Sequence, residues 1–285
     1  MRRLALLLFV SIGFAIGSEP GTVRIVAANL TSGKQQAYSP DNANHSNLEG
    51  AGARILKALA PDIVLIQEFN TTMPTRQWVN ATFGESFSFV QEPGPGIPNG
   101  VISRFPIIES GEWDDVVLEN RDFVWAKIAL PDGTKLWAVS VHFYTKSSSA
   151  RVEQARALIG LLRDRVQPGE RIVIGGDLNT RETSESCFAE LAALVTIPTN
   201  PPSDQLGNIH TNSPRNRPYD WVLVDPATES KEAPVRLAGE EFSDGFVFDS
   251  RAFDARQVPP PVQPDDSGVF GMQHMAVVRD FFIGK

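Results

Sequence analysis

Polar side chains of the kinds that handle protons and metal ions stand at the ends of several apolar segments of this sequence. Each segment is rich in Val, Ile, Leu or Ala, and a carboxylate, amide or imidazole closes or opens it. The residues concerned are Asn29, Glu68, His142, Asp177 with Asn179, Asp220 and His274. The ends of strands in α/β scaffolds meet at one rim of a sheet, where such folds place their chemistry. We therefore expect these seven side chains to meet in one site.

Each position also has a purely structural explanation. Asn29 could be a turn residue, Glu68 a solvated strand end and His142 a satisfied core histidine. The combination favours a site, because two of the four histidines stand on or beside apolar strands. Glu68 and Asn29 offer hard oxygen ligands, which suit Mg²⁺ or Mn²⁺ better than zinc. The sequence contains no HExxH motif, no Gly-x-Ser-x-Gly elbow and no Walker loop.

The apolar segments predict the elements that would hold these residues. Runs rich in Val and Ile predict strands, and apolar residues three or four apart predict helices. We expect strands over 23–30, 62–69, 86–92, 100–108, 123–130, 135–143, 171–178, 219–224 and 274–283, and helices over 47–60, 147–166 and 188–194. This order predicts two layers of sheet with helices outside. Residues 225–270 show little periodicity and predict a long surface excursion with one short strand at 245–248.

The first 18 residues, MRRLALLLFVSIGFAIGS, have the order of a secretory signal peptide, with two arginines, an apolar run and small residues at the end. An uncleaved N-terminal anchor is the alternative. We expect an exported protein, periplasmic or secreted, without stable membrane insertion. Residues 19–285 then form one sheet-rich domain, which we expect to be a monomer. Cys187 is the single cysteine, so no intramolecular disulfide can form.

The charge of the chain limits the partners that it can attract. The formal net charge is −8, and removal of Arg2 and Arg3 with the signal peptide would bring it near −10. Such a field repels polyphosphates at long range, so non-specific binding of duplex DNA should be weak. A nucleic-acid substrate is still compatible with this charge, because a bound cation can reverse the potential within a small site.

Seven segments taken together resemble the endonuclease/exonuclease/phosphatase superfamily, which has the DNase I-like fold. The segments are ANL around Asn29, PDIVLIQE ending on Glu68, SRFPI at 103–107, VSVHF around His142, IGGDLNT around Asp177 and Asn179, YDWVLV with Asp220, and QHMAVV with His274. The resemblance runs from about residue 23 to residue 285. It implies an α+β fold, a four-layered α-β-β-α sandwich of two mixed sheets, and hydrolysis of phosphate esters with a divalent cation.

The resemblance also implies roles for the residues. Glu68, helped by Asn29, would bind Mg²⁺ or Mn²⁺, whose charge neutralises the non-bridging phosphate oxygens in the transition state. Asp177 would orient or deprotonate the attacking water, and the amide of Asn179 would donate to a phosphate oxygen. His274 and Asp220 would act as a pair. The imidazole of His274 would face the phosphate, and the carboxylate of Asp220 would accept a hydrogen bond from its other ring nitrogen.

Other implied roles have open alternatives. His142 matches the second histidine of the superfamily, with Asp122 as its acidic partner, although Asp122 could equally be a hairpin turn residue. Arg104 could contact a substrate phosphate or belong to a structural turn. Arg215 and Arg217 precede Asp220 in a loop that could meet the substrate.

Gln273 is the main departure from the superfamily pattern. Members commonly carry Asp directly before the last histidine, where it helps to position the metal or its bound water. A neutral amide at this position predicts weaker metal affinity, unless Asp265 or Asp266 reaches the site from the preceding loop.

The leading functional hypothesis is an exported, metal-dependent phosphodiester hydrolase, with a nuclease as the favoured kind. A phosphatase or a phosphodiesterase acting on phospholipids or phosphoinositides would use the same fold. Substrates would accordingly be nucleic acids, small phosphate esters or phospholipid headgroups. A catalytically silent binding domain is the third hypothesis, and the full set of costly strand-end polar groups argues against it.

Overall fold

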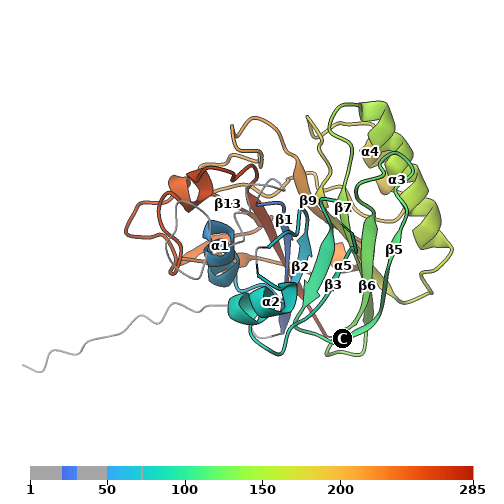
Figure 1. Ribbon diagram of the computed structural model, residues 1–285, viewed down its shortest axis with the longest axis horizontal. Helices are drawn as coiled ribbons and strands as arrows, with labels where there is room; N and C mark the ends of the chain where they lie inside the picture. Colours follow the sequence, from blue (N-terminus) through green and yellow to red (C-terminus); the bar gives the residue numbers. More distant parts are fainter. Residues whose placement is uncertain (1–20, 31–49, 72, 95, 285) are drawn as a thin grey trace, which may run out of the picture.

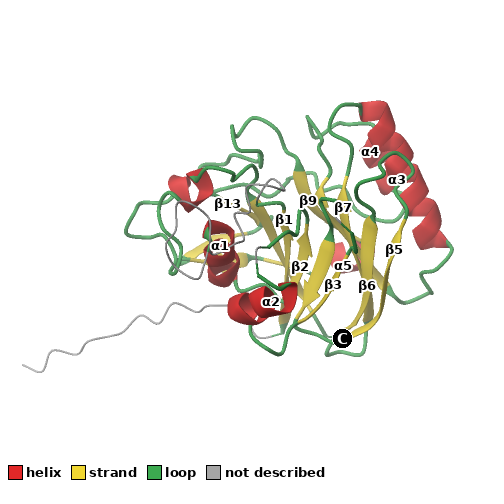
Figure 2. Cartoon of the chain, in the orientation of Figure 1, coloured by secondary structure: helices red, strands yellow, loops and turns green. Residues whose placement is uncertain are grey.

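The fold is built on two large β-sheets packed face to face, with helices on both outer sides (Figure 1). The computed structural model describes residues 21–30, 50–71, 73–94 and 96–284. The signal peptide predicted for residues 1–18 lies outside the described residues, as do positions 47–49 of the first predicted helix. Strands form the centre of the molecule and helices its periphery (Figure 2). The predicted α+β sandwich is confirmed.

The first sheet has seven strands. They are β1 (Thr22–Ala28), β2 (Ile63–Ile66), β3 (Ser88–Gln91), β4 (Gly100–Ser103), β10 (Glu232–Ala233), β13 (Phe246–Phe248) and β14 (Ala276–Phe282). Their order is β10-β14-β1-β2-β4-β3, and β13 also pairs with β14. β1 and β2 run parallel, whereas β14 runs antiparallel to β1. The outer helices on this side are α1 (Ala51–Leu59) and α2 (Thr75–Phe83).

The second sheet has five strands in sequence order. They are β5 (Ile107–Trp113), β6 (Phe123–Ala129), β7 (Lys135–His142), β8 (Arg171–Asp177) and β9 (Asp220–Val224). β7 and β8 run parallel, and the other pairs run antiparallel. Helices α3 (Ser148–Arg163) and α4 (Cys187–Leu191) cover its outer face. The hydroxyl of Ser147 caps α3 by accepting from the backbone N–H of Ala150, as the serine run predicted.

Apolar side chains fill two interiors, one between the sheets and one beneath α3 and α4. Alternation along β7 shows the division: Leu136 and Ala138 belong to the core between the sheets, whereas Val139 and Val141 pack beneath the helices. A strand covered on both faces reads as a continuous apolar run. This is why β7 and β8 could be recognised from sequence.

The segment predicted as one strand over 100–108 forms two strands in different sheets. β4 ends at Ser103, and β5 begins at Ile107 in the other sheet. Pro106 lies between them, and proline has no N–H to donate to a sheet ladder. The turn at 104–106 therefore carries the chain from one sheet to the other.

Residues 225–270 contain more structure than the surface excursion that was predicted. Besides β10 and β13, they form α5 (Pro226–Glu229), β11 (Val235–Leu237), β12 (Glu240–Phe242) and the 3₁₀ turns η1 (Ser250–Ala252) and η2 (Asp266–Gly268). All three residues of β13 are buried and pair with β14. The short strand predicted at 245–248 is confirmed as β13. The other strands of this segment have only two or three residues and are too short to show periodicity. Helix α2 was also missed.

Within the described part of the chain, no helix combines the length and the apolar character needed to cross a membrane.

Candidate active site

Three of the candidate residues lie side by side at one end of the five-stranded sheet. In the pairing of β7, β8 and β9, His142 stands opposite Asp177, and Asp177 stands opposite Asp220. Side chains two residues apart on a strand point the same way, and Ala138 faces the other sheet. His142, four residues further on, therefore also points toward the other sheet. All three site residues are at most 5% exposed.

The seven-stranded sheet supplies two residues to the same place. Ala28 and Ile66 are neighbours in the parallel pairing of β1 and β2, and Asn29 and Glu68 follow just beyond them. The Nδ2 group of Asn29 donates to Oδ2 of Asp177 at 3.1 Å and approaches Oε1 of Glu68 at 3.5 Å. The two sheets thus join at the site through Asn29.

Two glycines before Asp177 allow the sheets to approach this closely. A Cβ atom on Gly175 would come within 2.6 Å of the Leu65 side chain, which belongs to the opposite sheet. A Cβ atom on Gly176 would meet the Gln67 side chain at 2.3 Å, and the φ of Gly176 is +128°. Only glycine fits both the space and the backbone at this point.

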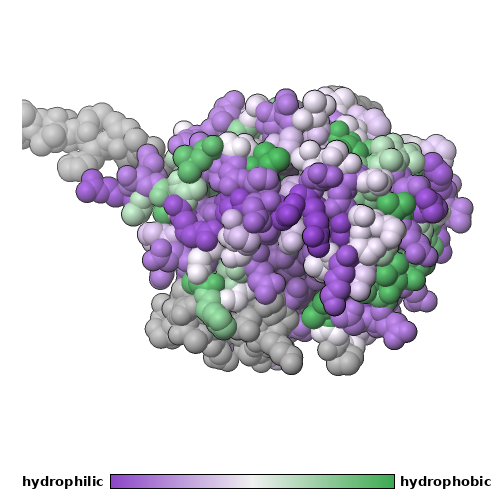
Figure 3. All heavy atoms as spheres, turned by 90° about the horizontal axis from the view of Figure 1, so that it is seen from above, coloured by the Kyte–Doolittle hydropathy of each residue, from purple (hydrophilic) through white to green (hydrophobic). Residues whose placement is uncertain are grey.

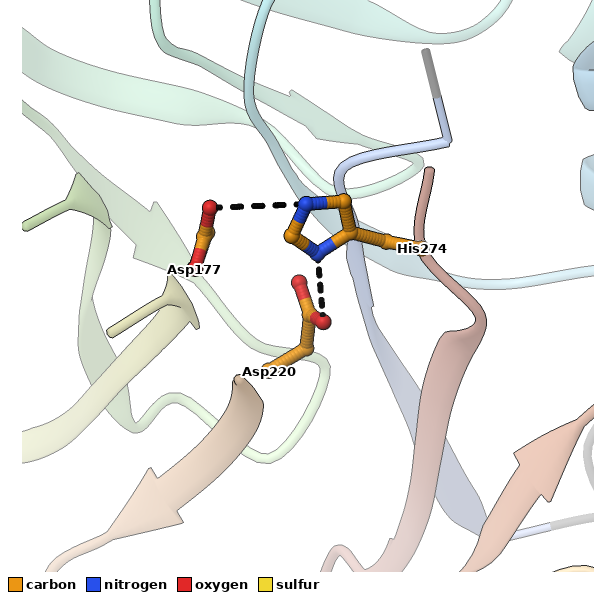
Figure 4. Close-up of side chains that lie close together, drawn as sticks. All are labelled: Asp177, Asp220 and His274. Carbon is orange, nitrogen blue, oxygen red and sulfur yellow. Dashed lines mark hydrogen bonds and ion pairs between the residues drawn. The ribbon is translucent and has the colours of Figure 1, made fainter. Parts of the chain in front are cut away.

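His274 lies between the two aspartates (Figure 4). Its Nδ1 is 2.8 Å from Oδ2 of Asp220, and its Nε2 is 3.7 Å from Oδ2 of Asp177. The hydroxyl of Thr211 also donates to Oδ2 of Asp220, at 2.6 Å. Thr211 had no sequence signal, because a single threonine in a loop is unremarkable without its partner. Asp220 therefore lies within hydrogen-bond distance of His274, which is the contact that an orienting carboxylate would need.

Asn179 adopts a left-handed backbone conformation, with φ of 52°. Its backbone N–H donates to Oδ1 of Asp177 at 2.8 Å, and its Nδ2 donates to Oδ2 of the same carboxylate at 3.0 Å. The Nδ2 group also donates to the carbonyl of Phe143 at 3.0 Å. The backbone and side-chain N–H groups of Asn179 thus hold both oxygens of the Asp177 carboxylate.

Charges within the site determine which groups are ionised. Burial disfavours the carboxylate of Asp177, but the nearby His274 and His142 outweigh it and lower its pKa to about 2. Burial likewise disfavours the imidazolium of His274, but Asp220 and Asp177 raise its pKa to about 9. Burial raises the pKa of Asp220 to about 6, against the attraction of His274. At neutral pH the carboxylates of Asp177 and Asp220 therefore lie beside the imidazolium of His274.

The residues present suit a hard divalent cation. Asn29 is fully buried, and among the described residues neither its Oδ1 nor Oδ1 of Asp220 has a hydrogen-bond partner. Buried polar atoms without partners are uncommon, and a cation is one way to satisfy them. Ligand atoms of Asp177, Asp220 and His274 also lie within 4.8 Å of one another. Because a protonated imidazole cannot ligate a metal, oxygen ligands from Glu68, Asn29 and the aspartates fit the cation better than His274 does.

His142 and Asp122 are not brought together. Nε2 of His142 lies 3.2 Å from Oδ2 of Asp177, whereas its Nδ1 has no hydrogen-bond partner in the described part of the chain. Asp122 instead accepts from the backbone N–H of Asp115 at 3.0 Å, which is the turn role that was its alternative. The guanidinium of Arg121, buried beside the site, donates to the carbonyl of His142 at 2.7 Å. Arg121 was missed because its neighbour in sequence, Asp122, better matched the superfamily pattern.

The three arginines proposed for substrate have different places. Arg104 follows Ser103, which pairs with Ile63 at the opposite end of β2 from Glu68, and its guanidinium forms an ion pair with Asp62 at 2.8 Å. The alternative role, a structural turn, therefore describes Arg104 better than a phosphate contact.

Arg215 is also held away from the substrate side. Its guanidinium pairs with Asp204 at 2.6 Å and with Asp249 at 2.5 Å. Arg217, by contrast, is exposed, and its guanidinium donates to the carbonyl of Arg181, in the loop that follows Asp177. Of the three arginines, only Arg217 lies on the rim of the site.

Gln273 is exposed beside His274, and Asp266 of the preceding loop does not replace the missing charge. Asp266 is buried in an ion pair with Arg54 of α1, and Asp265 is exposed. We therefore expect Gln273→Asp to lower the Mg²⁺ concentration for half-maximal phosphodiesterase activity about tenfold. Gln257→Asp, an exposed loop position, is the matched control and should leave the requirement unchanged. An unchanged requirement in Gln273→Asp would contradict this account.

The raised pKa of His274 predicts a pH-dependent stability of the metal-free protein. Because the folded-state pKa is about 9, above the ordinary 6.5, the stabilisation is complete below pH 6.5 and is lost as the pH rises through 9. We expect the free energy of unfolding to fall by about 2 kcal/mol between neutral and strongly alkaline pH. Urea unfolding in EDTA should show a smaller fall for His274→Gln. An equal fall in both proteins would show that another group is responsible.

Solved structures with this architecture are numerous. D. rerio TDP2 complexed with a single-strand DNA product has 16% identity and a TM-score of 0.59, and the match covers 91% of this chain and 98% of that one. An endonuclease/exonuclease/phosphatase from Bacteroides vulgatus has 15% identity and a TM-score of 0.59, with coverage of 92% and 99%. Beta toxin from Staphylococcus aureus has 13% identity and a TM-score of 0.57, with coverage of 90% and 99%. At these identities the likeness shows the fold.

Sequence comparison gives the family. No curated protein matches the chain. Residues 42–244, more than half of the chain, match the Endonuclease/Exonuclease/phosphatase family. This match agrees with the two-sheet fold and with the group of carboxylates and histidines at the strand ends. The chain therefore belongs to the Endonuclease/Exonuclease/phosphatase family, whose members are hydrolases that act on phosphoester bonds.

Proposed function

We propose that the protein is a divalent-metal-dependent phosphodiester hydrolase and that its activity is that of a nuclease. The observation that carries the proposal is the position of Asp177. Its buried carboxylate lies where the two sheets join, within 3.2 Å of donors from Asn29, Asn179 and His142. Such an arrangement holds an ionised carboxylate at a fixed point in a site of low dielectric, which is what an electrostatic catalyst requires.

The role of Asp177 is orientation of the attacking water rather than removal of its proton. A general base works best with a pKa near the operating pH, and the pKa of Asp177 is lowered to about 2. Its carboxylate can nevertheless accept a hydrogen bond from water and direct the oxygen lone pair toward phosphorus. The surrounding N–H groups prevent the carboxylate from turning.

His274 stabilises the phosphate on the other side. With a pKa of about 9, its imidazole is protonated at neutral pH, so both ring nitrogens donate. Nδ1 donates to Asp220, while Nε2 is 3.7 Å from Asp177, beyond hydrogen-bond distance, and can donate to a phosphate oxygen. Asp220 thus orients the ring and supports its positive charge.

Glu68 and Asn29 would hold the cation, with Asp177 beside them. When bound, Mg²⁺ or Mn²⁺ supplies positive charge to the non-bridging oxygens as the transition state develops. Oδ1 of the buried Asn29 and the adjacent carboxylates supply oxygen ligands of the kind that these ions prefer.

The choice of a nuclease rests partly on structural similarity to TDP2. The TDP2 structure contains a single-strand DNA product, and its fold resembles this one over most of both chains. A phosphatase, or a phosphodiesterase acting on phospholipids, is the second candidate, since one fold hosts several substrates. A catalytically silent domain would have no use for a buried, fully ionised Asp177.

Hydrolysis of bis-p-nitrophenyl phosphate tests the proposal. We expect turnover with Mg²⁺ or Mn²⁺, loss of turnover in EDTA, and recovery when the metal is restored. Turnover no greater than that of Asp177→Asn would overturn the enzyme proposal. Rates on single-stranded DNA, duplex DNA, RNA, lysophospholipid and inositol phosphate then separate the nuclease from the other hydrolases.

We also propose that the protein is exported and acts as a monomer. The order of charged, apolar and small residues in positions 1–18 supports export. N-terminal sequencing of the protein recovered from the producing cells tests this, because a start at residue 1 would contradict cleavage. Light scattering of the mature protein measures its oligomeric state.

A further inference from the structure

Three cationic side chains stand on the loops around the proposed catalytic residues. Lys146 follows His142 by four residues, Arg181 follows Asp177 by four, and Arg217 precedes Asp220 by three. Because β7, β8 and β9 are adjacent and their site ends coincide, these loops are neighbours. Seen from above in Figure 3, this end of the molecule is strongly hydrophilic near its centre.

A groove of about 400 Å³ lies between two of these loops and the start of α3. We call it the basic groove; it is lined by Lys146, Ser148, Arg151, Arg181, Glu182, Ser184, Glu185 and Ser186. The three serines are exposed, so their hydroxyls are available to donate hydrogen bonds. The loop from Asp177 leads directly from the catalytic carboxylate into this groove.

The backbone around the basic groove is held firmly. Glu185 accepts from the backbone N–H of Arg181 at 2.6 Å and from the guanidinium of the buried Arg151 at 2.6 and 2.9 Å. The hydroxyl of Thr180 donates to the carbonyl of Pro218 at 2.5 Å, which ties the loop to the one that carries Arg217. Cations on a fixed backbone can bind an anion with little ordering cost.

The charges of the basic groove leave two cations available. Arg151 and Glu185 neutralise each other in their two-point ion pair, and Glu182 is exposed at the edge. Lys146 and Arg181 are both exposed, and neither forms an ion pair within the described part of the chain. The groove therefore carries a net charge of about +1 in a protein with a formal net charge of −8.

Several arginines elsewhere in the same protein are matched with carboxylates. Arg24 pairs with Asp280, Arg279 with Glu229, and Arg215 with Asp204. Two cations that line one groove beside the site without an ion pair among the described residues favour a ligand that brings its own negative charge. The single carboxylate at the edge of the groove is too few to neutralise both.

We propose that the basic groove binds the phosphate groups of single-stranded nucleic acid that flank the scissile phosphate. This inference rests on the proposed function and names the substrate class. A positively charged groove that follows the backbone is the usual way to hold a single strand without reading its sequence. Duplex DNA presents a broader anionic surface, which the acidic remainder of the protein would repel.

Binding and turnover, measured separately, test the inference. Binding of a fluorescent 12-nucleotide single-stranded DNA is measured by anisotropy with Mg²⁺ in the inactive Asp177→Asn protein. We expect Lys146→Ala and Arg181→Ala each to raise the Kd about fivefold, and each substitution to reduce the slope of log Kd against log salt by about 0.7. Arg163→Ala is the matched control, since this exposed residue ends α3, about 22 Å from its start.

Turnover is measured in the otherwise unmodified protein. The ratio of kcat/KM on the oligonucleotide to kcat/KM on bis-p-nitrophenyl phosphate should fall about fivefold in Lys146→Ala and in Arg181→Ala, and should keep its original value in Arg163→Ala. Thermal unfolding of each variant confirms that the fold is retained. Rescue of oligonucleotide affinity by Arg181→Lys would support a charge contact.

The outcomes separate this inference from the proposed function. If the protein hydrolyses bis-p-nitrophenyl phosphate but both groove variants bind DNA as the original does, the groove assignment is wrong and the hydrolase proposal stands. If the groove variants lose DNA affinity but no diester is hydrolysed, the groove assignment stands and the hydrolase proposal fails. If the variants instead lose binding to phosphatidylserine vesicles with DNA affinity unchanged, the groove serves a membrane surface and our assignment is overturned.

Discussion

Asp177→Asn should lower kcat for phosphodiester hydrolysis by about 1000-fold or more while leaving the protein folded. The substitution keeps the size of the side chain but removes its charge. Asp177 receives hydrogen bonds from the backbone and side chain of Asn179 and from Asn29. An amide cannot accept all of them, because one of its two polar atoms is itself a donor. The substitution therefore removes both the charge and the group that orients the attacking water.

Stability should fall along with activity. The pKa of Asp177 is lowered from 3.8 to about 2, so its ionised form stabilises the folded state at neutral pH, and this stabilisation is lost as the pH falls through 2. Removing the charge should cost about 2 kcal/mol, which is measured by urea unfolding. Asp225→Asn is the matched control: Asp225 is buried just beyond the opposite end of β9, where it caps α5. It should lower stability without lowering kcat. A similar kcat for Asp177→Asn and the original protein would refute the assigned role.

His274→Gln should lower kcat by about 100- to 1000-fold, roughly the contribution of one positioned donor in a dry site. Glutamine can still donate to a phosphate oxygen, but it lacks the positive charge that Asp220 and Asp177 support in the imidazole. Asp220→Asn should cost less, about tenfold to 100-fold, because the ring remains in place. The double variant should be no worse than His274→Gln alone, because the two residues act as one unit.

The pH dependence of the Asp220→Asn variant gives a second readout. Without the carboxylate that supports its charge, His274 should lose its proton at lower pH, so the alkaline decline of kcat should move toward neutrality. His210→Gln, a change to a half-buried histidine in the neighbouring loop, is the control and should keep kcat within about twofold. An unchanged alkaline limb in Asp220→Asn would show that Asp220 does not act through His274.

The strands that carry the site were predictable because their composition reflects burial on both faces. β7 and β8 have apolar side chains toward both the core between the sheets and the outer helices, so they read as continuous runs that end on His142 and Asp177. Pairing could not be read in the same way. Neither segment alone indicates that His142 stands opposite Asp177, because the register of a strand pair depends on the residues of both strands.

The less accurate predictions concern residues whose role depends on a distant partner. Arg104 had two open roles, a phosphate contact or a structural turn, and its ion pair with Asp62 favours the turn. Arg215 was a candidate to meet the substrate, but it pairs with Asp204 and Asp249. Asp122 could equally be the acidic partner of His142 or a turn residue, and its hydrogen bond with the backbone of Asp115 fits the turn role. The two-residue strand β10 owes its conformation to β14 rather than to its own composition. Local sequence carries little information about such pairings.

The sequence by itself determined the type of fold, the family resemblance and most of the residues that meet at the site. These follow from local properties: apolar periodicity, turn residues and polar side chains at strand ends. Only the tertiary structure decided that Asn29 joins the two sheets at Asp177, that Arg104 lies at the far end of β2, and that Lys146 and Arg181 border one groove. The physical reason is that charges and hydrogen bonds act over a few ångströms in space, whereas these residues are far apart in the chain.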